Sequence, residues 1–175
     1  CMCIQKTTVA VGPPTTPPPT SEEGVLQLSW LSSGPQLPTA LGEVTAVVVG
    51  SKMYAFGDGS AATFVYDIGT QSWTSNSARR PYVGDHHKAV AVGSKIYLVG
   101  GFTYPCVVST CRGHMQAYDV ASNTWETLGA LPYNVEGSVA AEYLDGHIHV
   151  CTGLFHRTSS GGYAGWNGPA GANPT

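Results

Sequence analysis

The sequence of residues 87–101, HKAVAVGSKIYLVGG, joins two apolar segments through a Gly-Ser turn and ends on a glycine pair. Similar stretches lie on either side of it. VGSKMYAFGD begins 43 residues before VGSKIYLVGG, and LDGHIHVCTG begins 52 residues after it. The chain is therefore a repeat array, and one structural unit must account for every copy.

Aromatic and acidic residues between these stretches keep the same register. The recurring residues are Tyr66, Asp67 and Trp73 in one unit and Tyr118, Asp119 and Trp125 in the next, each 52 residues on. A further tryptophan, Trp30, completes a series of three that each precede the turn of the next hairpin by 20 residues. The repeat therefore extends well beyond its glycine-rich hairpin.

A unit of about 50 residues with a glycine pair, a Tyr-Asp step and a spaced Trp resembles the kelch repeat, which forms one four-stranded blade of a β-propeller. The glycines of this signature are Gly57, Gly100, Gly101 and Gly153. The resemblance implies an all-β fold of antiparallel blades over residues 25–153. It also implies a protein-binding or structural role, since most kelch domains serve as such modules.

The expected strands follow from alternation, apolar runs and turn signals. They are 44–49, 52–56, 63–67 and 72–74 in a first blade (44–74), 88–92, 95–99, 115–119 and 124–126 in a second (87–126), and 138–143 and 147–151 in a half blade (138–153). Residues 25–31 read as a leading outer strand carrying Trp30. The run TAVVV at 45–49 predicts an innermost strand buried on both faces. The matching innermost strands contain KAVAV and SVAAEY.

Composition agrees with this fold. The 175 residues include 22 glycines and 12 prolines, which suits a chain with many turns, and no apolar run approaches the ~20 residues of a membrane span. A formal charge of -3 offers no electrostatic basis for binding nucleic acid or an anionic membrane surface. We therefore expect a protein partner or a second copy of the chain, with a carbohydrate as the alternative.

The segments outside the repeats differ in character. Residues 1–24 form a Cys/Pro/Thr-rich segment or linker, and PPTTPPPT at 13–20 favours an extended polyproline spacer. Residues 154–175 form a Gly-rich tail. Threonines in the spacer are candidate O-glycosylation sites, namely Thr15, Thr16 and Thr20. A plain stiff linker explains the same composition.

Five cysteines bear on the compartment. Cys106 and Cys111 lie in a nine-residue insertion of the second repeat, and we expect them to form a disulfide that closes this loop. The pairing of Cys1 and Cys3 is open, and Cys151 is expected to be a buried strand residue. Together with the Pro/Thr spacer, the loop disulfide favours an extracellular or cell-surface location.

The six histidines raise the question of a metal site. His147 and His149 share one strand face and are weak candidate ligands, but they also occupy ordinary repeat positions. A metal site needs one or two further ligands, for which His87, His114 and His156 are the candidates, and nothing in the sequence brings these together. We therefore predict no metal and no cofactor.

No catalytic pattern is present. A general-base role for His86 and His87 competes with a structural one, because a histidine commonly begins the innermost strand of a kelch blade. Asp67 and Asp119 are expected to accept backbone hydrogen bonds in turns. The basic pair Arg79-Arg80 is expected to be solvated. The chain also lacks a nucleophile elbow and a phosphate loop.

These observations predict a non-enzymatic extracellular binding or structural module. One alternative is a fragment of a sugar-active or copper-oxidase-like kelch enzyme, and another is an intracellular kelch substrate adaptor. Two repeats, a half repeat and a leading strand make at most three blades, whereas propellers have about 4–8. We therefore expect the chain to complete itself by self-association or as part of a longer chain, with the strand around Trp30 pairing with the third repeat within or between copies.

Overall fold

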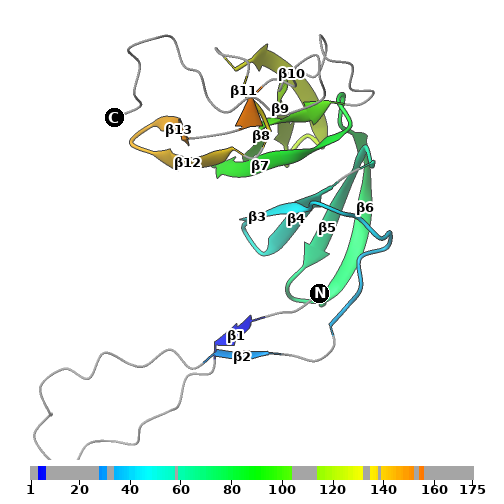
Figure 1. Cartoon of the computed structure of the whole chain (residues 1–175). Helices are drawn as coiled ribbons and strands as arrows, with labels where there is room; N and C mark the ends of the chain where they lie inside the picture. Colours follow the sequence, from blue (N-terminus) through cyan, green and yellow to red (C-terminus); the bar gives the residue numbers. More distant parts are fainter. Residues whose placement is uncertain are drawn as a thin grey trace, which may run out of the picture. The chain divides into compact units, whose positions relative to one another are not determined.

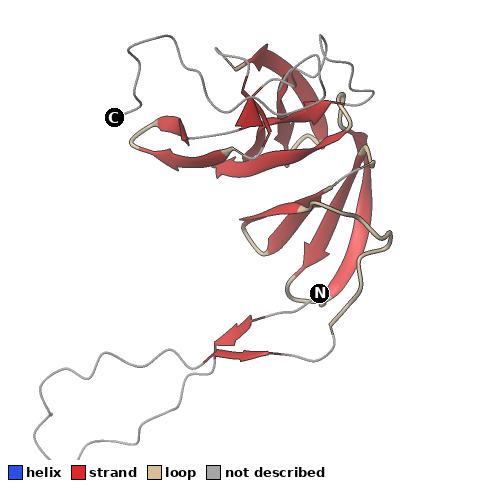
Figure 2. Ribbon diagram, in the orientation of Figure 1, coloured by secondary structure: helices blue, strands red, loops and turns tan. Residues whose placement is uncertain are grey.

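The structure is a computed structural model, and it describes residues 4–6, 28–30, 34–57, 59–103, 114–131, 135–137, 139–151 and 154–155. The chain divides into two compact units, Cys1–Leu37 and Pro38–Thr175. Every regular element among the described residues is a β-strand, which confirms the predicted all-β fold (Figure 2). In this described part of the chain, no helix is long and apolar enough to cross a membrane.

The first repeat forms a four-stranded antiparallel sheet whose strands lie in sequence order (Figure 1). Its strands are β3 (Thr45–Val49), β4 (Lys52–Phe56), β5 (Ala62–Asp67) and β6 (Ser72–Arg79). Val49 pairs with Lys52 across a two-residue turn that begins at Gly50. Gly50 has a φ of 60°, a left-handed conformation that glycine adopts at little steric cost. The predicted Gly-Ser hairpin is confirmed.

The second repeat builds the same sheet from residues 84–130. Its strands are β7 (Gly84–Val92), β8 (Lys95–Thr103), β9 (His114–Asp119) and β10 (Thr124–Ala130). Its hairpin repeats the first one, since Val92 pairs with Lys95 and Gly93 again has a φ of 60°. Both sheets are propeller blades of the predicted kind, and β3 lies beside β7 at the innermost position of each.

The signature tyrosines and tryptophans pair across the last two strands of each blade. Tyr66 lies opposite Trp73 with ring centroids 5.2 Å apart, and Tyr118 lies opposite Trp125 at 5.1 Å. Cross-strand aromatic pairs of this kind stabilise a sheet beyond simple burial. The predicted placement of Trp73 and Trp125 on outer strands is confirmed, because β6 and β10 are the terminal strands of their sheets.

The two blades share an apolar core. Its fully buried members are Tyr54, Phe56 and Val65 from the first blade and Ala89, Ile96, Leu98 and Tyr118 from the second. Trp125 reaches across this joint, where its ring meets Phe56 edge-on at 5.6 Å and its Nε1 donates to Thr63 Oγ1 at 3.1 Å. Each large apolar side chain buried here contributes about 1.5–3 kcal/mol, so the joint stabilises both blades.

The third repeat contributes a hairpin of β12 (Ala140–Leu144) and β13 (His147–Cys151), turned at Asp145 and Gly146. Its inner face lies against the second blade, because Val139 and Ala141 pack on Val90 and Val99. β11 (Val135–Gly137), before the predicted start of the half blade, pairs with β14 (Leu154–Phe155), after its predicted end. These two short strands lack the repeat's residue signals, so the sequence pattern did not indicate them.

The expectation that residues 45–49 are buried on both faces is wrong. Thr45, Val47 and Val49 are partly covered, whereas Ala46 is exposed and Val48 is 53% exposed. The covered face looks toward the second blade. In the described part of the chain no further blade packs on the opposite face. The unbroken apolar run therefore belongs to a strand position that neighbouring blades can cover on both faces. In the described residues only one of these faces is covered.

The described part of the leading strand around Trp30 pairs with a second short strand of the N-terminal unit. β2 (Leu28–Trp30) pairs antiparallel with β1 (Ile4–Lys6), with Ile4 opposite Trp30. The sequence pattern of residues 1–24 did not indicate β1, which precedes the proline-rich spacer at 13–20. Pairing of β2 with the third repeat, of its own chain or between copies, stays a prediction.

Candidate functional site

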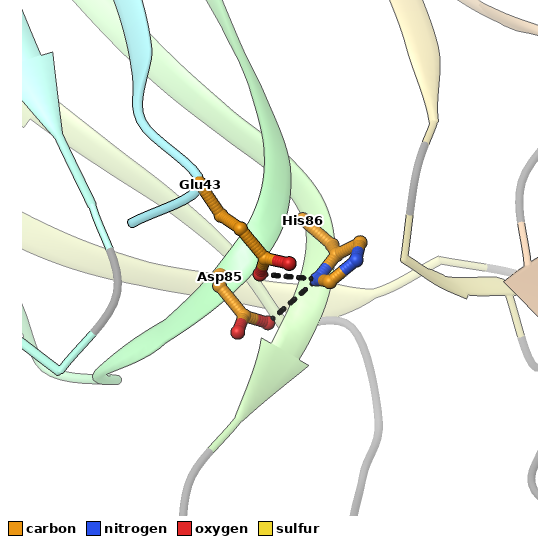
Figure 3. Close-up of side chains that lie close together, drawn as sticks. All are labelled: Glu43, Asp85 and His86. Carbon is orange, nitrogen blue, oxygen red and sulfur yellow. Dashed lines mark hydrogen bonds and ion pairs between the residues drawn. The ribbon is translucent and has the colours of Figure 1, made fainter. Parts of the chain in front are cut away.

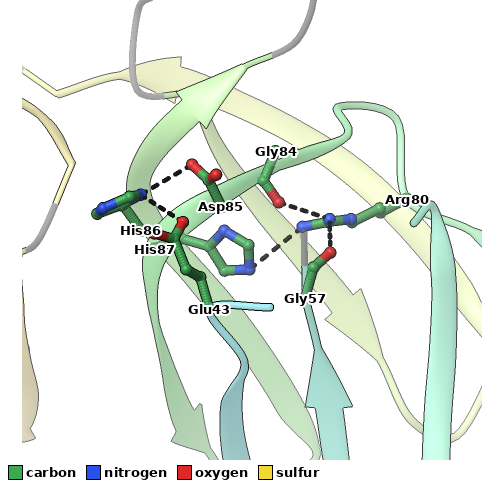
Figure 4. A network of polar contacts seen from close by, with 7 residues as sticks. All are labelled: Glu43, Gly57, Arg80, Gly84, Asp85, His86 and His87. Atoms are coloured by element: carbon green, nitrogen blue, oxygen red, sulfur yellow. Dashed lines mark hydrogen bonds and ion pairs between the residues drawn. The ribbon is translucent and has the colours of Figure 1, made fainter. Parts of the chain in front are cut away.

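A buried arginine joins the two blades at the start of β7. Arg80 is 3% exposed, and its guanidinium donates to three backbone carbonyls: Gly57 O at 2.6 Å, Gly84 O at 2.7 Å and Ser60 O at 2.8 Å (Figure 4). The prediction of a solvated Arg79-Arg80 pair is therefore wrong for Arg80, while Arg79 is exposed. A planar fork of donors can satisfy converging carbonyls that no water reaches, which makes burial of this cation feasible.

The fourth partner of Arg80 is His87, whose Nε2 lies 3.2 Å from Arg80 Nη1. Arginine can only donate, so Nε2 must accept and the imidazole proton resides on Nδ1. Burial and, next, the positive charge of Arg80 lower the pKa of His87 from 6.5 to about 4, although the backbone carbonyl of Asp85 favours the protonated ring. His87 is thus neutral at pH 7. The predicted structural role of this histidine is confirmed, since it is a hydrogen-bonded part of the joint between the blades.

The backbone beside His87 is unusual. His86 has a φ of 56°, and Gly101 on the facing strand has a φ of 92°. A Cβ on Gly101 would lie 2.6 Å from the carbonyl oxygen of Asp85 and 2.8 Å from His87 Cβ. Only glycine fits there. The second glycine of the pair therefore permits the close approach that turns the His86 side chain out of the regular strand pattern.

Glu43 adopts the same left-handed conformation in the first blade, with a φ of 50°. It precedes His86 by 43 residues, which is the offset between the two hairpins, so the two residues occupy one repeat position in adjacent blades. Because the innermost strands β3 and β7 lie side by side, this shared position brings the two side chains together.

The resulting cluster consists of Glu43, Asp85 and His86 (Figure 3). His86 Nδ1 lies 2.8 Å from Glu43 Oε2 and 2.9 Å from Asp85 Oδ1, and the ligand atoms of all three residues lie within 4.8 Å of one another. The Asp85 side chain is 4% exposed, the His86 side chain 29% and the Glu43 side chain 47%. The cluster therefore has a buried base and an opening to solvent.

The other sequence-predicted residues take structural positions. Asp67 Oδ1 accepts from the N–H groups of Gly69 and Thr70, each at 2.9 Å, and Asp119 Oδ1 accepts from Ser122 N at 2.9 Å. These hydrogen bonds lower the pKa of both carboxyls. The prediction of turn-capping aspartates is confirmed.

The signature glycines play two roles. Gly57 allows close packing, because a Cβ there would lie 3.0 Å from Leu41, and Gly100 has a φ of 68°. Gly153 lies outside the described residues, as do Cys106, Cys111, the candidate O-glycosylation sites and the two N-terminal cysteines. The expected loop disulfide therefore stays a prediction.

The weak metal candidates lie on β13, away from the cluster. His147 and His149 are exposed on one face with ring centroids 6.3 Å apart, as their spacing predicted. Each has a ring nitrogen within hydrogen-bonding distance of a backbone carbonyl, Asp145 O and Leu144 O respectively. Cys151 on the same strand is an exposed free thiol, so the expectation of a buried residue is wrong. β13 ends a two-stranded sheet, and no outer strand covers its thiol in the described part of the chain.

Sequence reasoning missed Arg80 and the cluster of Glu43, Asp85 and His86. A signal for one pair was present, since aligning the hairpins places Glu43 and His86 at the same repeat position. No signal marked Asp85, because the equivalent residue of the first repeat is Gly42. The burial of Arg80 depends on carbonyls of two blades and has no local pattern.

Comparison with known families agrees with the repeat geometry. Residues 85–132 match the family model of the Kelch motif. That range covers most of β7 and all of β8, β9 and β10, which form the second blade. No curated protein matches the chain. The second repeat is thus a kelch motif, which indicates a β-propeller module of the protein-binding or structural kind.

Proposed function

We propose that this chain is a non-enzymatic, extracellular kelch module for binding or assembly, and that its first blade is covered by another blade from a second copy or from a longer chain. The exposed face of β3 carries this proposal. Val48 is 53% exposed and the adjoining Val44 is 46% exposed. Exposed apolar side chains gathered on one sheet face mark a surface that another protein surface covers.

The repeat itself provides the comparison. Ala46 on β3 and Ala89 on β7 occupy the same repeat position, 43 residues apart. Ala46 is exposed, whereas Ala89 is 2% exposed because the first blade packs against it. In the second blade this position is covered by the blade that precedes it. The first blade is also apolar at this position, although it is exposed there.

The other end of the array supports the same reading. Leu144 is 60% exposed on β12, while Val92 at the equivalent position of β7 is only partly exposed and packs against the third repeat. Uncovered apolar surface stabilises association by about 25 cal/mol for each Å² removed from water. An array with exposed apolar residues on its first blade and on its third repeat is therefore suited to associate with another copy.

Light scattering coupled to size exclusion, over a range of concentrations, tests the assembly. We expect oligomers, and Val48→Asp should weaken them because it places a charge in the covered surface. Ile68→Asp is the matched control, since Ile68 is 48% exposed but lies in the turn after β5. A well-folded, monodisperse monomer at every concentration would refute association between copies.

The extracellular assignment rests on the Pro/Thr-rich spacer and on the expected pair of Cys106 and Cys111. Intact-mass spectrometry of protein from its natural source, with thiols alkylated before and after reduction, reports whether the two cysteines are joined. A disulfide supports an oxidising compartment. Free thiols at both positions would favour the intracellular adaptor instead.

A further inference from the structure

We propose that Glu43, Asp85 and His86 form a binding site for a divalent transition-metal ion, with Zn²⁺ as the representative ion, and that the ion braces the first blade against the second. This inference does not depend on the proposed assembly. Its ligands would be Glu43 Oε2, Asp85 Oδ1 and His86 Nδ1. Two carboxylates and an imidazole are a donor set that such ions accept.

The first argument is the convergence of negative charge. Both carboxylates have an oxygen within 2.9 Å of one imidazole nitrogen, His86 Nδ1. The ligand oxygens of the two carboxylates also lie within 4.8 Å of each other, so two negative charges meet at this point. A positive charge at this point relieves the repulsion between them, and a divalent ion balances both carboxylates.

The second argument is geometric. A tetrahedral Zn²⁺ with bonds of about 2.0–2.2 Å separates neighbouring ligand atoms by roughly 3.3–3.5 Å. The two nitrogen–oxygen distances of 2.8 and 2.9 Å would therefore open by about half an ångström. Glu43 can supply much of this movement, since its side chain is 47% exposed. The Asp85 side chain is 4% exposed at the buried base of the cluster, and a water from the solvent side would serve as the fourth ligand.

The third argument concerns the neighbouring cation. Arg80 donates to the carbonyl oxygens of Gly57, Gly84 and Ser60, which take up most of its donor capacity. The ring of His87 lies between Arg80 and the cluster (Figure 4). The positive charge that opposes a metal ion is therefore directed toward backbone dipoles, and the His87 side chain separates it from the cluster.

The consequence for the fold follows from where the ligands originate. Glu43 precedes β3 in the first blade, whereas Asp85 and His86 belong to β7 in the second. An ion shared among them links the two innermost strands at one end of the joint. Binding should therefore raise the midpoint of thermal unfolding.

Calorimetric titration of the purified chain with Zn²⁺, after treatment with a chelator and alkylation of free thiols, tests the site. We expect one strong equivalent and a rise in the unfolding midpoint. Glu43→Gln keeps the side-chain shape without its charge, and His86→Asn suits the left-handed backbone while removing the imidazole. Each should lower the affinity at least tenfold.

The competing site on β13 provides the control. His149→Gln removes one ring of the exposed His147 and His149 pair and should leave the strong equivalent unchanged. Loss of binding in this variant would assign the ion to β13 and overturn the proposal. It is equally overturned if Glu43→Gln and His86→Asn bind as tightly as the wild type, if the chain takes up no Zn²⁺, or if Ca²⁺ and Mg²⁺ bind more tightly than Zn²⁺.

Discussion

Acid should weaken the joint between the blades through His87. Its pKa is about 4 in the folded chain, against 6.5 for an unperturbed histidine. Between these values the unfolded chain binds the proton and the folded chain resists it, so the free energy of unfolding falls as the pH falls. The contribution of the neutral ring is complete above pH 6.5 and is lost progressively down to about pH 4.

The magnitude follows from the two pKa values. Each pKa unit corresponds to about 1.4 kcal/mol, so the full loss below pH 4 is roughly 3 kcal/mol. Between pH 7 and pH 5 the same relation gives a loss of about 2 kcal/mol. That is a large share of the 5–15 kcal/mol typical of a small domain.

Urea unfolding of the wild type and of His87→Gln at pH 7 and pH 5 measures this effect. Glutamine can accept from Arg80 and donate to the Asp85 carbonyl without titrating, so we expect the variant to lose about 1 kcal/mol at pH 7. The difference in the free energy of unfolding between the wild type and His87→Gln should change by about 2 kcal/mol between pH 7 and pH 5. It should therefore shrink or reverse its sign at pH 5. His149→Gln, at an exposed position, should follow the wild type at both pH values. Parallel pH dependences for wild type and His87→Gln would show that the ring is not held neutral by the fold.

Three further substitutions probe the joint by urea unfolding. Gly101→Ala places a Cβ 2.6 Å from a backbone oxygen at a φ of 92° and should cost about 2–4 kcal/mol, whereas Gly129→Ala, with no atom within 4 Å, should cost less than 1 kcal/mol. Arg80→Lys leaves buried carbonyls unsatisfied and should cost about 2–3 kcal/mol, and Arg79→Lys, which is exposed, should be close to neutral. Trp125→Phe removes the donor to Thr63 Oγ1, which should cost about 1–2 kcal/mol; an unchanged midpoint would mean that this hydrogen bond adds nothing.

The sequence by itself determined the blade and its repetition. The turns at Gly50 and Gly93, the Tyr–Trp pairs and the capping aspartates Asp67 and Asp119 all lie where their spacing placed them. These features depend on hydrogen bonds and contacts between strands that follow each other directly in the chain. A local pattern is sufficient to specify them, because turn geometry and strand alternation act over a few residues.

Only the tertiary structure decided which residues meet across the blades. The sequence pattern marked residues 45–49 as a doubly buried strand, but their burial depends on whether a neighbouring sheet covers each face. The burial of Arg80 requires carbonyls from two blades, and the cluster of Glu43, Asp85 and His86 joins positions about 40 residues apart. Burial and charge are properties of such assembled surroundings. The residue pattern of a single strand does not predict burial or charge environment, because the residues that create them come from other parts of the chain.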